Sequence, residues 1–169
     1  NGGATPSKAV VGEVVPTFAV IWREGHDAMN ATLNVKGPKE SAFASRSQRI
    51  PMHFSDHDPN QVNATFVPDV PGLWTIRIDA WSDPMATWRN AITKKFEAGQ
   101  SEAELANDLE IGAALFDRAA AGAAAIHRNH LRSIAAGLRG DGDLRLTLNK
   151  ATAGDVLSLL FQSGYAARA

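Results

Sequence analysis

The stretch Pro71–Arg89 constrains the fold more than any other part of the chain, because it holds three of the four tryptophans. From Leu73 to Trp81 its residues alternate between two faces, which is the period of a half-buried strand. Asp83-Pro84 ends this strand, because proline has no N–H to donate. Large rings need cover on a broad face, so we predict that the strand lies centrally in an antiparallel sandwich. The face to be covered carries Trp74, Ile76, Ile78 and Ala80.

Other short stretches also have the composition or alternation of strands. Val14–Trp22 is apolar on both faces, with Phe18, Val20 and Trp22 on one of them, so we expect it to be covered on both sides. Pro16 is expected at a sheet edge or a bulge, and Pro51 at a sheet edge. The remaining candidates are Ala9–Val11, Ala31–Val35, Ser47–Phe54 and Gln61–Val67. Several short strands separated by turns predict a β-sandwich.

The second half of the chain has a helical pattern. Ser101–Glu104 has the form of a capping box and predicts a helix over Glu102–Ala121. A stripe of Leu131, Ile134, Ala135 and Leu138 predicts another over His127–Gly140. We expect a strand at Ala91–Glu97, a short strand or extended link at Leu144–Leu148, and a last helix at Thr152–Gln162 with Asp155 in its first turn. The chain is thus divided into a flexible leader (1–8), a sandwich (9–98) and a helical segment (99–169).

Composition narrows the classes of function. A chain of 169 residues without cysteine has no disulfide framework and no thiol nucleophile, which suits a reducing cytoplasm. Its net charge of -1 argues against a nucleic-acid partner, which would require a concentrated basic face. No apolar run approaches the roughly 20 residues of a membrane helix. We therefore expect neither nucleic acid nor a membrane among the partners.

No residue pattern predicts a metal, a cofactor or a catalytic site. The run His53–Asp58 concentrates two imidazoles and two carboxylates, but no second cluster has ligand spacing. His127 and His130 share a helix face without a third ligand, and Asp141-Gly-Asp143 is only a piece of a calcium loop. The acidic residues are scattered, and no nucleophile elbow or Gly-rich phosphate loop is present.

Two features remain as candidate contact sites. One lies where the tryptophan strand ends, since aromatic faces beside polar groups stack on sugars or anchor protein interfaces. The alternative is that Trp74 and Trp88 are core rings and that Arg89 pairs with an acid such as Asp83. The other feature is the charged turn Arg23–Asp27. The candidate residues are Arg23, Glu24, His26, Asp27, Trp81, Asp83, Trp88 and Arg89.

Two separated motifs carry a resemblance to a known family. The first reads Pro71-Gly-x-Trp74 and continues as Ala80-Trp-Ser-Asp-Pro-x-Ala-Thr-Trp-Arg89, and the second is Arg23-Glu-Gly-His-Asp27. In this order they resemble the N-terminal domain of the bacterial alpha-1,4-glucan:maltose-1-phosphate maltosyltransferases, over about Ala9–Ala121. The resemblance is also what makes an interface role for the charged turn plausible.

The resemblance implies a fold and a role. The fold is an immunoglobulin-like sandwich that carries helices. The family's members are cytoplasmic, retaining glycosyltransferases of the alpha-amylase superfamily that move maltosyl units from maltose 1-phosphate onto alpha-1,4-glucans. Their catalytic Asp and Glu lie on a barrel domain that this chain lacks, so we expect no turnover by the chain itself. The N-terminal domain packs on that barrel and contributes to a homodimer, and some apolar surface of the sheet or the last helix is expected to be uncovered here.

Two other readings stay open at this point. The chain fits a glucan-binding module in which Trp81, Trp88 or Trp22 is the stacking platform. It also fits a free-standing adaptor domain.

Overall fold

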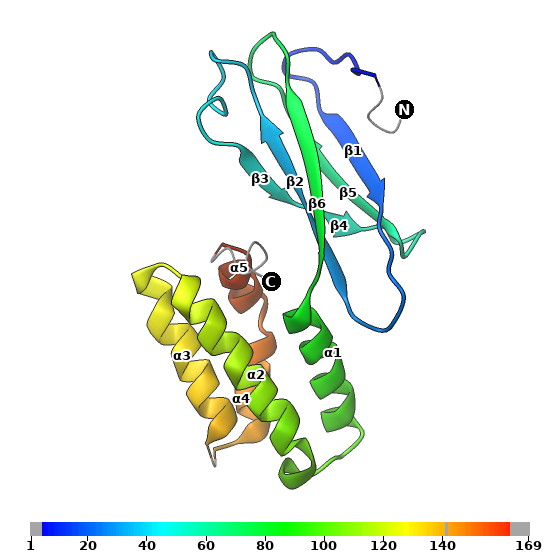
Figure 1. Ribbon diagram of the computed structural model, residues 1–169. Helices are drawn as coiled ribbons and strands as arrows, with labels where there is room; N and C mark the ends of the chain where they lie inside the picture. The colour runs from blue at the N-terminus through cyan, green and yellow to red at the C-terminus, as the bar shows by residue number, and fades with distance from the viewer. Residues whose placement is uncertain (1–4, 141, 163–169) are drawn as a thin grey trace. The chain divides into compact units, whose positions relative to one another are not determined.

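The computed structural model of the protein describes residues 5–140 and 142–162 (Figure 1). Part of the expected leader (1–4), Asp141 of the expected turn, and the end of the expected helical segment (163–169) lie outside the described residues. The chain forms two compact units. The sheet unit consists of the described residues up to 25 together with 29–81, and the helical unit consists of 26–28 together with the described residues from 82 onward.

The sheet unit contains two three-stranded sheets, and Figure 1 labels their strands. The strand orders are β1-β5-β4 and β3-β2-β6. β1 pairs with β5 in an antiparallel register that runs from Val15 opposite Phe66 to Val20 opposite Gln61. The strands are β1 (Val15–Val20), β2 (Met29–Lys36), β3 (Gln48–Pro51), β4 (His53–Phe54), β5 (Gln61–Phe66) and β6 (Thr75–Ser82).

The two sheets share one apolar core. Alternate residues of β2 and β5 point into it, as the period of two requires. Trp74 closes the core, because its ring lies 6.0 Å from that of Phe66 and its Nε1 donates to the Val70 carbonyl at 3.1 Å. The buried members are Ala31, Leu33, Val35, Met52, Val62 and Phe66. The prediction of an antiparallel sandwich followed by helices is confirmed, and its immunoglobulin-like topology stays a prediction.

The positions of the strands correct two expectations. β6, the tryptophan strand, lies at the edge of its sheet, and Ile76 is 47% exposed. The central place belongs to β2, whose Ala31, Leu33 and Val35 are fully buried. No strand forms at Ala9–Val11. The edge positions expected from the prolines are confirmed, since Pro16 lies in β1 and Pro51 in β3, both edge strands.

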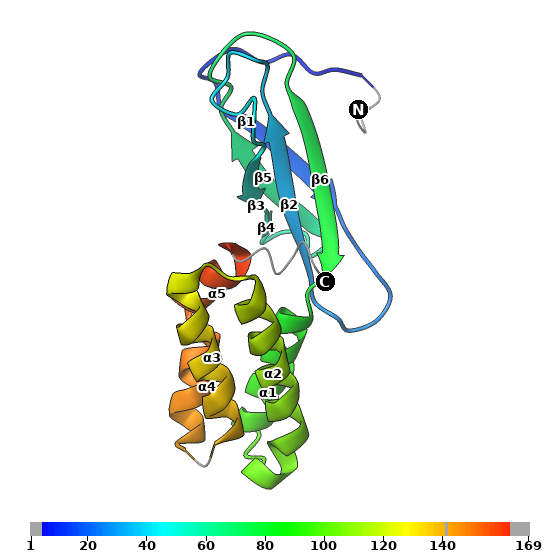
Figure 2. The same cartoon turned by 60° about the vertical axis from the view of Figure 1, so that its left-hand side comes forward.

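The helical unit has its own core. α2 packs against α1 on one side and α3 on the other, as Figures 1 and 2 show. The helices are α1 (Pro84–Glu97), α2 (Glu102–Gly122), α3 (Ala125–Arg139), α4 (Leu144–Thr152) and α5 (Gly154–Gln162). Phe116, Ile92, Leu105 and Leu131 are its largest fully buried side chains. Among the described residues, no helix combines the length and apolar composition that crossing a bilayer requires.

Two expected extended segments are helical. Ala91–Glu97 is the second half of α1, which starts with Asp83 accepting from the Ala86 N–H at 3.0 Å and with Pro84 in its first turn. Leu144–Leu148 is the first half of α4, because the Asp143 side chain accepts from the Leu146 N–H at 3.1 Å. In both places a capping side chain and the burial of one helix face stabilise the helix more than the weak alternation of residues favours a strand.

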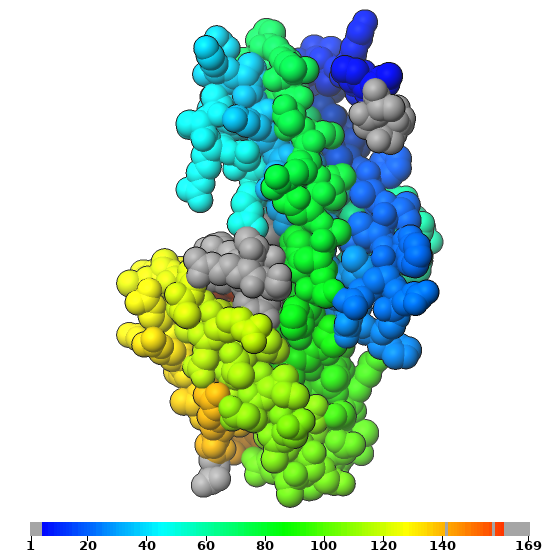
Figure 3. All heavy atoms as spheres, viewed as in Figure 1, coloured from blue at the N-terminus to red at the C-terminus, as the bar shows by residue number. Residues whose placement is uncertain are grey.

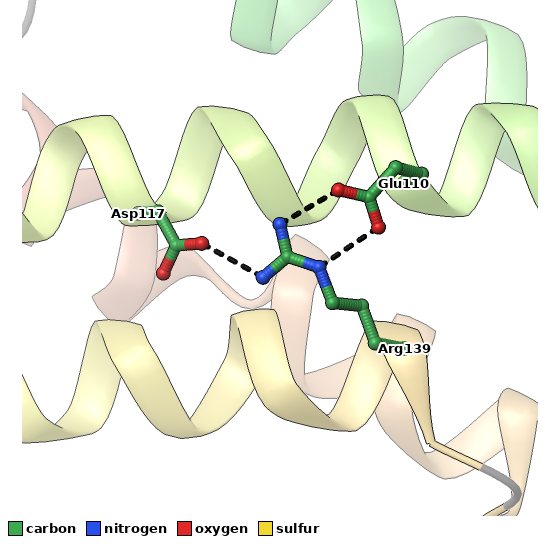
Figure 4. Close-up of polar contacts among 3 residues, drawn as sticks. All are labelled: Glu110, Asp117 and Arg139. Atoms are coloured by element: carbon green, nitrogen blue, oxygen red, sulfur yellow. Dashed lines mark hydrogen bonds and ion pairs between the residues drawn. The ribbon is translucent and has the colours of Figure 1, made fainter.

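The predictions for the other helices are confirmed. The capping box opens α2, with the N–H and the hydroxyl of Ser101 donating to Glu104 at 2.7 and 2.6 Å. The predicted stripe of α3 is buried. α5 carries Asp155 in its first turn. Arg139 of α3 reaches two acids of α2, donating to Glu110 through two nitrogens and to Asp117 through a third, at 2.7–2.8 Å (Figure 4).

Candidate functional site

The two sequence motifs meet at the start of α1. The Ala28 N–H donates to Thr87 Oγ1 at 2.9 Å, and the Asp83 N–H donates to the Ala28 carbonyl at 2.8 Å. Thr87 Oγ1 in turn donates to the Asp83 carbonyl at 2.9 Å. Through these bonds the segment 26–28, which contains the end of the charged turn, is fastened to the first turn of α1. Asp27 thereby joins the residues of the tryptophan motif.

A pocket of about 340 Å³ lies at this meeting point, within the helical unit. α1 contributes one face, with residues spaced i, i+3, i+4 and i+7, and α2 contributes residues spaced i, i+3 and i+7. The lining is largely aliphatic and aromatic, with acidic and hydroxyl groups among it. It consists of Asp27 and Ser82, of Pro84, Thr87, Trp88 and Ala91 from α1, and of Asp108, Ile111 and Leu115 from α2.

Trp88 is a core ring at the wall of this pocket. It is 4% exposed, and its Nε1 donates to the Asp108 carbonyl at 2.6 Å. Its ring meets that of Phe116 edge to face, with centroids 6.0 Å apart and planes at 87°. α2 approaches closely because Gly112 has no side chain: an added Cβ there would collide with the indole. The indole is therefore fixed in position by contacts on several sides.

Arg89 of α1 is partly buried. Its terminal nitrogen is 3.4 Å from the Thr152 carbonyl, and its buried Nε has no hydrogen-bond partner within the described part of the chain. Burial lowers the pKa of the Arg89 guanidinium, and the negative charge of Asp83 opposes that change. The carboxylate of Asp83 therefore caps α1, whereas Arg89 reaches α4.

The polar groups of the pocket largely serve the fold. The Asp108 carboxylate accepts from Lys95 Nζ at 2.7 and 2.9 Å, so its charge is paired across α1 and α2. Thr87 Oγ1 is engaged with Ala28 and Asp83. No three His, Cys, Asp or Glu side chains gather into a metal-binding group within residues 5–140 and 142–162. An apolar wall with engaged polar groups suits contact with another surface better than bond cleavage.

The remaining candidates lie elsewhere. Arg23, Glu24 and Trp81 belong to the sheet unit, the first two exposed and Trp81 half-buried at the end of β6. His26 is exposed in the segment 26–28. The functional roles expected of the eight candidate residues from the sequence analysis stay predictions. Sequence reasoning missed the α2 side of the pocket, formed by Asp108, Ile111 and Leu115. It expected a strand at Ala91–Glu97, so it had no helix α1 against which α2 could pack.

Comparison with known proteins identifies the family. The profile described as "Alpha-1,4-glucan:maltose-1-phosphate maltosyltransferase, domain N/S" matches residues 1–165. The chain is 55% identical over 155 residues to the alpha-1,4-glucan:maltose-1-phosphate maltosyltransferase of Corynebacterium glutamicum, which covers 92% of this chain and 23% of that protein. It is 42% identical over 182 residues to the enzyme of the same name from Mycolicibacterium smegmatis, covering 95% of this chain and 26% of that protein.

A third relative, from Mycobacterium tuberculosis, carries the same name and is 43% identical over 160 residues, covering 83% of this chain and 23% of its own length. The chain thus spans about a quarter of the length of these relatives, and it matches their N-terminal part. The chain therefore belongs to the domain N/S family of the alpha-1,4-glucan:maltose-1-phosphate maltosyltransferases.

Proposed function

We propose that the chain is the non-catalytic N-terminal domain of a maltosyltransferase that transfers maltosyl units from maltose 1-phosphate to alpha-1,4-glucans. In this role it supports the catalytic barrel and takes part in homodimer formation, and the enzyme works in the cytoplasm. The observation that carries the proposal is the family match over residues 1–165 in a chain that spans about a quarter of its relatives. The partners are the enzyme's own catalytic domain and a second copy.

The structural duties of the acids support a non-catalytic role. Glycoside chemistry requires two carboxyl groups held across a sugar, one of them free to donate a proton. Five acids of the helical unit are engaged in structural contacts: Asp83 and Glu104 cap helices, Asp108 pairs with Lys95, and Glu110 and Asp117 accept from Arg139. Carboxylates engaged in this way are poorly suited to proton transfer.

A chimera tests the proposal. This chain is substituted for the matching N-terminal part of the Corynebacterium glutamicum relative, and phosphate release from maltose 1-phosphate is measured with maltoheptaose as acceptor. We expect the chimera to elongate maltoheptaose and to sediment as the relative does, because the domains share 55% of their residues. The unmodified relative is the control. The chain alone should release no phosphate.

Two results would overturn the proposal. Turnover by the isolated chain would show that it carries its own catalytic site. A folded chimera that lacks activity and differs from the relative in its association state would show that the chain does not serve as the supporting domain.

A glucan-binding module is the second candidate, favoured by Trp22. This ring is 71% exposed, whereas Trp88 is buried. An exposed indole offers a flat apolar face on which a sugar ring can stack. If the chain binds glucan, titration with millimolar maltoheptaose changes the tryptophan fluorescence, and Trp22→Ala removes the change. An unchanged spectrum counts against this candidate.

A further inference from the structure

The two faces of β1 have opposite environments. Val15, Ala19 and Ile21 pack against the core of the sheet unit, and Thr17 between them is buried. The alternate residues point outward and stay in solvent, with exposed fractions of 57% to 71%. The large apolar residues on this face are here named the β1 outer row: Val14, Phe18, Val20 and Trp22, with the exposed Pro16 between the first two. In Figure 3 the side chains of β1 and of the loop that follows it, in blue, lie on the visible surface.

The neighbouring strand extends this face without adding charge. Cross-strand pairing sets Asn63 opposite Phe18 and Gln61 opposite Val20, and the two amides are joined by a 2.8 Å hydrogen bond. Beside the row, Val67 is 45% exposed. The face therefore combines an apolar row with uncharged amides, which is the composition of a face covered by protein rather than of a solvated one.

The sequence pattern predicts cover on both faces of β1, but the structure shows cover on only one of them within the described residues. A strand that is apolar on both faces is expected to be covered on both. Within the described residues, β1 has cover on its inner face, while the outer row stays exposed. If the outer row is covered in the full-length protein, the cover comes from outside the described residues.

We propose that the β1 outer row is the surface on which the C-terminal, catalytic part of the full-length polypeptide packs. This inference rests on the proposed function, which names the catalytic domain as a partner, and it adds which surface of the chain contacts that domain. The match is the N-terminal part of these relatives, and about three quarters of their length lies outside it. A domain on the same polypeptide is present at high effective concentration and stays bound. The face that it covers is permanently shielded from water and can therefore be apolar, as in obligate interfaces.

The other occupants fit the row less well. A sugar stacks on aromatic rings, and Phe18 and Trp22 offer two, but the row also contains the aliphatic Val14 and Val20. The flanking amides of Gln61 and Asn63 bond to each other. A second copy that adds a strand to β1 would meet Pro16, which has no N–H to offer the new neighbour.

Photocrosslinking in the full-length protein tests the inference. Phe18 is replaced by p-benzoylphenylalanine, an aromatic residue of similar character, and the protein is irradiated as an equal mixture of ¹⁴N- and ¹⁵N-labelled copies. We expect crosslinked peptides that join the row to the region C-terminal to the match and that carry a single label. The matched control places the same group at Leu73, which is 77% exposed in the same unit and should give no such link. Hydroxyl-radical oxidation of Trp22 should be several-fold slower in the full-length protein than in this chain.

Each other result overturns the inference. Mixed-label crosslinks alone would make a second copy the occupant. Trp22 oxidation that slows only when maltoheptaose is added would make the row a glucan site, and absence of both crosslink and protection would leave the row uncovered. Maltosyl transfer is measured on the same preparations. An active enzyme without the crosslink disproves the packing surface alone, whereas a full-length protein that transfers no maltosyl units disproves the proposed function.

Discussion

At the scale of single residues, the contact between Gly112 and Trp88 limits what the helical unit can accept. In a helix interior Gly→Ala normally stabilises by about 1 kcal/mol. Here a Cβ at Gly112 would meet the indole, which cannot retreat because Nε1 bonds to Asp108 and the ring packs on Phe116. Overpacking of this kind costs about 1–3 kcal/mol, so we expect Gly112→Ala to lower the free energy of unfolding. Urea unfolding followed by helical circular dichroism measures the change.

Gly154 provides the matched control. It opens α5, and a Cβ there would meet nothing within 4 Å. Gly154→Ala should therefore change the free energy of unfolding by no more than about 0.5 kcal/mol in either direction. If Gly112→Ala proved as neutral as Gly154→Ala, the close approach of α2 to the indole would be wrong.

Another residue-scale prediction concerns Glu104 in the capping box. The Ser101 hydroxyl and N–H both donate to its carboxylate, which lowers the pKa of Glu104 below its ordinary 4.5. Because the folded pKa is the lower one, the stabilisation is present above pH 4.5 and is lost as pH falls through the folded pKa. Ser101→Ala should raise this pKa toward 4.5 in an NMR titration of the carboxyl carbon. Ser133→Ala, in α3, should leave it unchanged, and a shift with both variants would contradict the local cause.

At the scale of elements, Arg139 joins α3 to α2 through a fork of three hydrogen bonds (Figure 4). The two bonds to Glu110 lower the pKa of its carboxyl group, so the stabilisation from these two bonds fades as pH falls below the ordinary 4.5. Exposed pairs are also screened by salt. We expect Arg139→Met to lower the melting temperature slightly at neutral pH and low salt. This difference from the wild type should shrink in about 1 M salt and at acid pH.

Arg132 is the matched control, since it is exposed on the same helix. Arg132→Met should leave the melting temperature nearly unchanged at either salt concentration. Equal effects of the two variants would show that the fork does not stabilise the contact between α2 and α3.

Elements with a complete local signal could be predicted from the sequence, and those defined by partners could not. α2 has a capping box and α3 a buried stripe, so both are visible along the chain. The seven residues of Ala91–Glu97 are too few to separate a strand from a helix, and their cap lies upstream at Asp83. The edge position of β6 depends on which strand takes the centre, which no local alternation specifies. In the pocket, Asp27 is placed by backbone bonds of Ala28 that any residue could make, so composition gives no signal for it.

At the scale of the whole molecule, the two units have separate cores, which predicts separate unfolding. Leu33 lies in the core of the sheet unit and Leu131 in that of the helical unit, and both are fully buried. Leu→Ala at such a site costs about 2–5 kcal/mol, because it removes buried methyl groups and leaves a cavity.

If the units unfold independently, Leu33→Ala lowers only the transition of the sheets and Leu131→Ala only that of the helices. Hydrogen exchange followed by mass spectrometry in increasing urea resolves the two, because amides of β2 and of α3 report on different units. Multidomain chains commonly depart from a single two-state transition, which is why a residue-resolved measurement is needed. One shared transition, shifted equally by both variants, would show that the chain unfolds as a single cooperative unit in spite of its two cores.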